Sequence, residues 1–160
     1  MTAQAHTISI SGGALSRGFW LYVWDIQHRD GRRLLYVGRT GDSSSLNAQS
    51  PFSRLSQHLG RNERGNALKR HLERNGIALE DCESLEMTAF GPLLPEERDE
   101  WEKHQRSRDY VAAIEKRLAD ALSAAGYHVL NKVHCLKSLD DAAWANVVAA
   151  FGEKFDRLRI

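Results

Sequence analysis

Residues 19–38 read FWLYVWDIQHRDGRRLLYVG, and this stretch decides the fold. Its segments 19–26 and 33–38 are rich in aromatic and branched residues, a composition typical of β-strands. Between them lies Asp30-Gly31, a turn signal, because glycine readily adopts the positive φ angles of tight hairpin turns. The stretch therefore predicts two antiparallel strands joined by a short turn.

The chain after this hairpin predicts two short helices and a third strand. Ser50 and Pro51 are the residue types of a helix N-cap and first turn, and Gly60 can end that helix. Residues 66–75 predict a second short helix. Partial alternation of apolar and polar residues over 82–90 predicts the third strand.

The rest of the chain is mainly helical in pattern. Residues 95–125 predict helix, with a break near Ser107 or Asp109, and residues 127–133 predict a short extended piece. The segment 138–141 has the form of a capping box with Asp in place of Glu. The helix that it opens, from about Leu139, carries its apolar residues on one face: Trp144, Val147, Val148, Phe151, Phe155 and Leu158.

Composition limits the class of protein. A chain of 160 residues with 42% hydrophobic residues suits one globular domain. Its two cysteines, Cys82 and Cys135, form neither a disulfide framework nor a zinc pattern. No apolar run is long enough to span a membrane, and the N-terminus lacks the features of a signal peptide. We therefore expect a soluble, cytoplasmic protein with no membrane partner.

The charges are unevenly distributed although the net charge is only +1. Residues 29–74 hold ten Lys and Arg against four Asp and Glu, a local charge of +6. Residues 75–102 hold one Arg against nine acids, a local charge of −8. One face could therefore attract a polyanion, but ordinary solvated helix and loop charges explain the same numbers.

Three groups of residues fit a purely structural role poorly. Glu115 lies at the border of an apolar helical stripe, where an unpaired carboxylate is costly unless it reaches water, pairs with an arginine or binds a metal. Arg54 and His58 are four residues apart, so they project from one helix face, which could also be a solvated face. Tyr22 and Tyr36 lie inside the predicted strands, where tyrosines are often core residues with satisfied hydroxyls.

Taken together, the order of these residues resembles that of the GIY-YIG nucleases. The first triplet corresponds to residues 20–22 (WLY), in which Trp20 stands in place of glycine, and the second to residues 36–38 (YVG), followed by Arg39-Thr40. A helix with Arg and His, a later Glu and a later Asn complete the pattern. The matching residues are Arg54, His58, Glu115 and Asn131, and the resemblance covers about residues 19–132.

The resemblance implies an α+β fold. We expect a small, mainly antiparallel sheet of three strands flanked by helices, plus a C-terminal amphipathic helix. The corresponding division is a flexible leader over residues 1–17, a GIY-YIG-like nuclease domain over 18–135, and a C-terminal helix over 136–160 packed on that domain.

The resemblance also implies an endonuclease that hydrolyses DNA phosphodiester bonds with Mg²⁺ or Mn²⁺. Glu115 would hold the metal, and Arg54 would bind phosphate, since its planar group matches the oxygens. A tyrosine would activate water; the choice between Tyr22 and Tyr36 stays open, with Tyr22 slightly preferred. Arg39 cannot accept a proton, so His58 is the expected relay.

The resemblance implies positioning and substrate-binding roles for the remaining matched residues. Asn131 would orient the site, while Gly38, Arg39 and Thr40 would lie against the substrate. A domain of this size would depend on a homodimer or a separate specificity partner to choose a DNA site. Two other classes stay open: a nucleic-acid-binding module with weak or no catalysis, and a protein-interaction domain that docks through the acidic residues 80–102.

Overall fold

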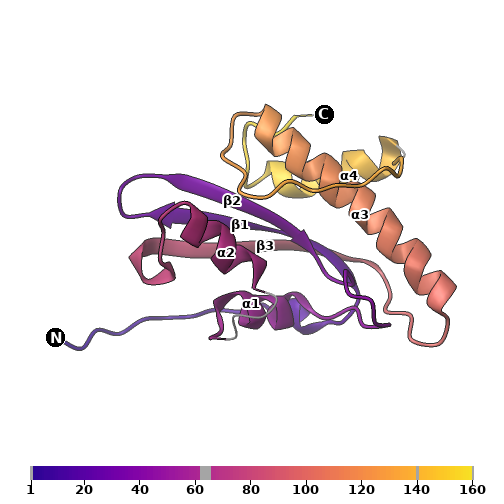
Figure 1. The fold of residues 1–160 in the computed structure, drawn as a ribbon, viewed down its shortest axis with the longest axis horizontal. Coiled ribbons are helices and arrows are strands. Elements are labelled where there is room, and N and C mark those ends of the chain that lie inside the picture. Colours follow the sequence, from indigo (N-terminus) through magenta and orange to yellow (C-terminus); the bar gives the residue numbers. More distant parts are fainter. Residues whose placement is uncertain (1, 62–65, 140, 160) are drawn as a thin grey trace.

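The computed structural model describes residues 2–61, 66–139 and 141–159 and has the predicted α+β fold. Three antiparallel strands form one sheet in the order β2-β1-β3. Their bounds are β1 Phe19–His28, β2 Arg33–Arg39 and β3 Cys82–Leu94. The prediction of a small three-stranded sheet with flanking helices is confirmed (Figure 1).

The hairpin forms where the turn signal predicts it. The Gly31 amide donates to the His28 carbonyl at 2.9 Å, and the His28 amide donates to the Arg32 carbonyl at 2.9 Å. Gly31 has a φ of 90°, a conformation that costs glycine little. In the resulting register, Trp24 pairs with Tyr36 and Tyr22 pairs with Gly38.

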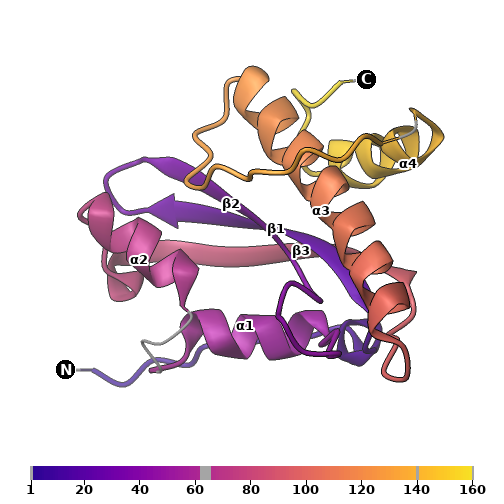
Figure 2. The same cartoon turned by 45° about the vertical axis from the view of Figure 1, so that its right-hand side comes forward.

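The helices lie in two groups, one on each face of the sheet (Figure 2). The first group is α1 Pro51–Leu59 and α2 Ala67–Arg74. Each begins at a capping side chain: Ser50 accepts from the Ser53 amide at 3.2 Å, and Asn66 accepts from the Lys69 amide at 3.0 Å. The second group is α3 Trp101–Ala124 and α4 Asp141–Gly152.

Alternation along the strands gives the sheet two different cores, because successive side chains point to opposite faces. On the α3 and α4 face, strand residues such as Leu21 and Val37 pack with Ile114, Leu118 and Phe151. On the α1 and α2 face, the core consists of Tyr22, Trp24, Ile26, Leu34, Tyr36, Leu68, Leu72 and Ile77. Both tyrosines of interest thus lie on the α1 and α2 face.

Two predicted boundaries in the middle of the chain are wrong. β3 continues past residue 90 to Leu94, because its pairing with β1 extends to Phe19. α3 begins at Trp101 and runs unbroken to Ala124. Asp109 does not start a new helix, since its carboxylate forms ion pairs with Arg108 and Lys137 instead.

The C-terminal helix is shorter than its apolar pattern predicts. α4 ends at Gly152, and hydrogen-bonded turns from Phe151 onward bring Phe155 and Leu158 into the same core without helix. Asp140, part of the predicted capping box, lies outside the described residues. No helix in the described ranges is long and apolar enough to cross a membrane.

The N-terminal segment, predicted as a flexible leader, has contacts near its end. A short 3-10 helix, Gly12–Leu15, lies against α1. Arg17 then donates two hydrogen bonds of 2.7 Å to the Glu96 carboxylate after β3. This ion pair fixes the chain where it enters β1.

Candidate functional site

The candidate site lies at the end of β2, the edge strand next to β1. Tyr22 on β1 faces Gly38 on β2 in the sheet register. A Cβ at Gly38 would stand 2.5 Å from the Tyr22 hydroxyl oxygen, so only glycine leaves room for the ring. The second triplet's glycine therefore has a direct steric reason to be there.

Tyr22 and His58 form a buried hydrogen-bonded pair. The Tyr22 hydroxyl and His58 Nε2 are 2.9 Å apart, and the two residues are 2% and 4% exposed. The Tyr36 ring lies against the same imidazole, with ring centroids 5.5 Å apart. His58 lies in the last turn of α1, a helix whose start is set by the Ser50 cap and Pro51. Both candidate tyrosines thus contact one histidine.

Three charged side chains adjoin this pair. Arg39 Nε donates to Glu115 Oε2 at 2.8 Å, which connects the end of β2 to α3. Arg54, on α1, forms an ion pair with Asp42 and donates to the Gln57 side chain at 3.2 Å. The Glu115 side chain is only 13% exposed. The predicted residues Tyr22, Tyr36, Arg54, His58 and Glu115 therefore come together, with Arg39 among them.

Burial and charge shift the pKa values of this cluster. Burial, and to a smaller extent the positive charge of Arg54, lower the pKa of His58 to about 4, so the imidazole is neutral at pH 7. Burial raises the pKa of Tyr36 to about 12 and raises that of Tyr22 as well, so both phenols keep their protons. Burial also raises the pKa of Glu115, while Arg39 and Arg54 oppose that rise.

Several donors in the cluster lack an acceptor. Within the described ranges, Arg39 Nη1, Arg54 Nε and His58 Nδ1 are buried and make no hydrogen bond. A buried unsatisfied donor costs about 1–3 kcal/mol, and more when the group is charged. Two arginine donors without acceptors next to a buried phenol are what a site for an anionic group would contain.

Asn131 holds the edge of β2 rather than facing the cluster. Its Oδ1 accepts from the Val37 amide at 3.0 Å, and its Nδ2 donates to the Val37 carbonyl at 2.7 Å. Beside it, Val129 forms a parallel bridge with Leu35. The side-chain amide thus continues the strand pairing by one residue and positions the segment that carries Tyr36.

The Thr40 side chain also forms its hydrogen bonds with backbone groups. It is fully buried, its hydroxyl donates to the Gly18 carbonyl, and it accepts from the Trp20 amide at 2.8 Å. This arrangement fixes the end of β2 against the start of β1. Its hydroxyl has no free donor for a substrate, whereas Arg39 has one in Nη1.

Sequence reasoning missed Asp42. It follows Gly41, whose φ of 74° turns the chain back toward α1 and brings the carboxylate onto Arg54. The only signal in the sequence is a Gly-Asp pair directly after the second triplet, which does not by itself indicate a partner twelve residues away. Asp42 matters because its carboxylate forms an ion pair with the Arg54 guanidinium group, which is the group predicted to bind phosphate.

A metal at this site would rely on few protein ligands. Residues 2–61, 66–139 and 141–159 contain no group of three or more His, Cys, Asp or Glu that could hold an ion. Glu115 offers the carboxylate oxygen that Mg²⁺ prefers, although Arg39 engages its Oε2. A metal held by Glu115 would therefore have one carboxylate oxygen of the described chain as a ligand and would take its other ligands from water or a bound anion.

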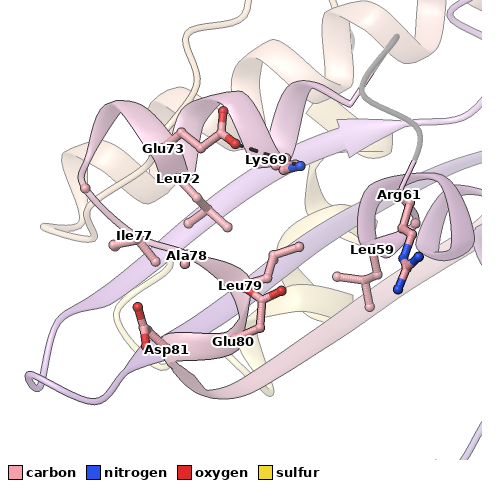
Figure 3. Close-up of a pocket in the computed structure, with 12 residues that line it drawn as sticks. Leu59, Arg61, Lys69, Leu72, Glu73, Ile77, Ala78, Leu79, Glu80 and Asp81 are labelled. Atoms are coloured by element: carbon pink, nitrogen blue, oxygen red, sulfur yellow. Dashed lines mark ion pairs between the residues drawn. The ribbon is translucent and has the colours of Figure 1, made fainter.

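A well-formed cavity of the described chain lies elsewhere. It measures about 550 Å³ and is lined by the end of α1, one face of α2 and the segment 76–81 (Figure 3). None of the predicted site residues lines it. The candidate site is instead a small, nearly closed cluster at the sheet edge.

The chain was compared with protein-family models, with curated proteins and with solved structures. None of the three comparisons finds a match.

Proposed function

We propose that the chain is a metal-dependent endonuclease of the GIY-YIG type that hydrolyses DNA phosphodiester bonds. The observation that carries the proposal is the buried cluster of Tyr22, Tyr36, His58, Arg54 and Glu115 with Arg39. It combines a neutral histidine, a hydrogen-bonded phenol and two arginine donors without acceptors. These groups supply a proton acceptor, a proton donor and phosphate ligands in one place.

Tyr22 is the better candidate for the group that activates water. Its hydroxyl is 2.9 Å from His58 Nε2, which is an acceptor when Nδ1 carries the ring proton. As the water proton moves to the Tyr22 oxygen, the Tyr22 proton moves to His58 Nε2. The water oxygen forms a new bond to phosphorus, the bond to the leaving sugar oxygen breaks, and that oxygen takes a proton from solvent.

The transfer has to be concerted, because burial disfavours both charged intermediates. A free Tyr22 phenolate is disfavoured, since burial raises its pKa, and a free imidazolium is disfavoured at a pKa of about 4. The bound phosphate changes this balance, because its negative charge stabilises a cationic His58. Substrate binding would thus favour proton transfer from Tyr22 to His58.

Arg54, Arg39 and Glu115 would position the phosphate. Arg54 Nε and Arg39 Nη1 are free to donate to its oxygens. To do so fully, the phosphate replaces Asp42 on Arg54, exchanging one anion for another. A divalent metal on Glu115 would neutralise charge developing on the phosphate and the leaving oxygen.

The test is nicking of supercoiled plasmid with Mg²⁺ by the wild type and by Glu115→Gln. The substitution keeps the size of the side chain and removes the metal-binding charge. We expect a loss of rate of about 100-fold or more, the range typical of removing a group that stabilises transition-state charge. Glu102→Gln is the matched control, because it is the same change at an exposed position of the same helix.

Equal nicking by the wild type and Glu115→Gln, or by neither, would overturn the proposal. Thermal unfolding of each protein shows that any lost activity is not lost folding. Three further variants test whether Tyr22 and His58 relay the proton. If they do, His58→Ala and Tyr22→Phe should both lower the nicking rate, and Tyr36→Phe should retain more of it. A greater loss in Tyr36→Phe would assign water activation to Tyr36.

A further inference from the structure

The exposed face of α2 carries charge that the candidate site does not account for. The helix presents three separate faces. Leu68 and Leu72 are buried in the core beneath it. Lys69 and Glu73 form an ion pair at 3.9 Å on a second face, which lines the large cavity (Figure 3). Arg70 and Arg74 project from a third face, four residues apart.

Arg70 and Arg74 are exposed, and neither forms an ion pair within the part of the chain that the structure describes. The site arginines differ, because Arg39 pairs with Glu115 and Arg54 pairs with Asp42. Arg33 is likewise paired, with Asp25. Much of the positive charge in residues 29–74 is thus compensated, while this face of α2 keeps a local charge of +2.

This face adjoins the site. The His71 ring lies beside the Tyr36 ring, with centroids 5.8 Å apart. The charge of Arg70 acts on Tyr36, where it opposes the rise in the tyrosine's pKa. Burial lowers the pKa of His71, and the charges of Arg74 and Arg70 act in the same direction. Arg70 and Arg74 therefore lie next to His71 and Tyr36, on the Tyr36 side of the candidate site.

We propose that Arg70 and Arg74 bind successive phosphates of the DNA strand that enters the site past Tyr36. The proposal rests on the proposed nuclease function for the identity of the polyanion. Two arginines at this spacing have Cβ atoms about 5–6 Å apart, so their long side chains can reach neighbouring phosphates. They make contacts to backbone only and thus hold the strand without reading its sequence.

The test is the salt dependence of DNA binding. A labelled 20-base-pair duplex is titrated in EDTA, which prevents cleavage, at salt concentrations from 50 to 200 mM. The variant is Arg70→Gln/Arg74→Gln. The control is Arg106→Gln/Arg159→Gln, which also removes two exposed cations, one from α3 and one near the C-terminal end.

We expect the α2 variant to bind about tenfold more weakly at low salt. Its plot of log affinity against log salt should be shallower by roughly 1.8, about 0.9 for each lost phosphate contact. Hydrolysis of a small phosphodiester, bis(4-nitrophenyl) phosphate, should be unchanged, because that substrate does not extend to α2. The control should match the wild type in both measurements.

The outcomes separate this proposal from the proposed function. If the wild type cleaves plasmid but the α2 variant keeps the wild-type salt slope, the α2 proposal is wrong and the nuclease proposal stands. If the slope falls as expected but no protein cleaves, the α2 surface stands and the nuclease proposal fails. Competition with poly-glutamate that is as strong as with DNA would assign the surface to acidic peptides and overturn the proposal.

Discussion

The two faces of the sheet are built from the same strands but hold different chemistry. The face under α3 and α4, the apolar face, is filled mainly by aliphatic and aromatic side chains, among them Leu21 and Phe151. The face under α1 and α2 contains both tyrosines and borders His58. The long helix covers the first face, while two helices of nine and eight residues cover the second.

The site lies where the two faces meet at the edge of the sheet, because Glu115 comes from α3 whereas Arg54 and His58 come from α1. The face under α3 and α4 contributes to folding mainly through burial and packing, although it also holds the buried Asp25 carboxylate, paired with Arg33, and the buried His104 ring beside Phe19. Arg54 Nε and His58 Nδ1, on the α1 side of the sheet, are buried and make no hydrogen bond in the described chain, and the same holds for Arg39 Nη1, beside Glu115 on the α3 side. Such groups cost folding free energy, and a bound phosphate would recover part of that cost.

The largest expected effect on folding comes from the apolar face. Phe151→Ala removes a fully buried ring that stacks near Phe155 and contacts Phe90 edge-on. We expect the free energy of unfolding to fall by about 3–5 kcal/mol, as for other buried aromatic truncations. Urea unfolding measures the change, and the cleavage rate per folded molecule should stay within about twofold.

Phe52→Ala is the matched control, since it removes the same ring from an exposed position on α1. It should cost well under 1 kcal/mol. A comparable loss in both variants would mean that stability is spread evenly over the two faces. A loss of specific activity in Phe151→Ala would mean that the apolar face does more than support the sheet.

Much of the fold follows from local patterns in the sequence. The hairpin, the caps at Ser50 and Asn66 and the three strands depend on neighbouring residues, so periodicity and turn chemistry predict them. The ends of β3 and α4 depend on tertiary contacts instead. β3 extends because β1 offers it a partner, and Phe155 is buried by a turn that the helical spacing could not distinguish from helix.

The candidate site was harder to predict for the same reason. The i, i+4 spacing of Arg54 and His58 indicated a shared face, but not that His58 would be buried against Tyr22. The apolar stripe around Glu115 indicated an unusual carboxylate, and its partner Arg39 lies 76 residues earlier. The pairing of Asp42 with Arg54 depends on the path of a loop, for which no local pattern exists.

The second prediction concerns stability at low pH on the face that holds the tyrosines. His58 has a pKa of about 4 in the folded chain and about 6.5 when unfolded. Between these values the unfolded state binds a proton that the folded state does not. Stability therefore rises with pH across this window, and it falls by roughly 3 kcal/mol as pH drops from 6.5 to 4.

Urea unfolding of the wild type and of His58→Gln at several pH values measures this contribution as the difference between the two curves. His71 and His104, whose pKa values burial also lowers, are common to both proteins and cancel. The curves should converge as the pH falls toward 4. Parallel curves over the whole window would show that His58 is not buried as a neutral ring.

The smallest of the three expected effects on stability is the most informative about the site. Gly38→Ala places a methyl group 2.5 Å from the Tyr22 hydroxyl oxygen, so the phenol has to move away from its hydrogen bond with His58. Overpacking of this kind costs about 1–3 kcal/mol, yet the cleavage rate should fall far more than that loss of stability explains.

Gly152→Ala is the control, because an added Cβ there meets no atom within 4 Å. Urea unfolding measures the loss of stability in both variants, and plasmid nicking measures the loss of cleavage rate. Full activity in Gly38→Ala would mean that the position of the Tyr22 hydroxyl is not critical, and the relay through His58 would then be wrong.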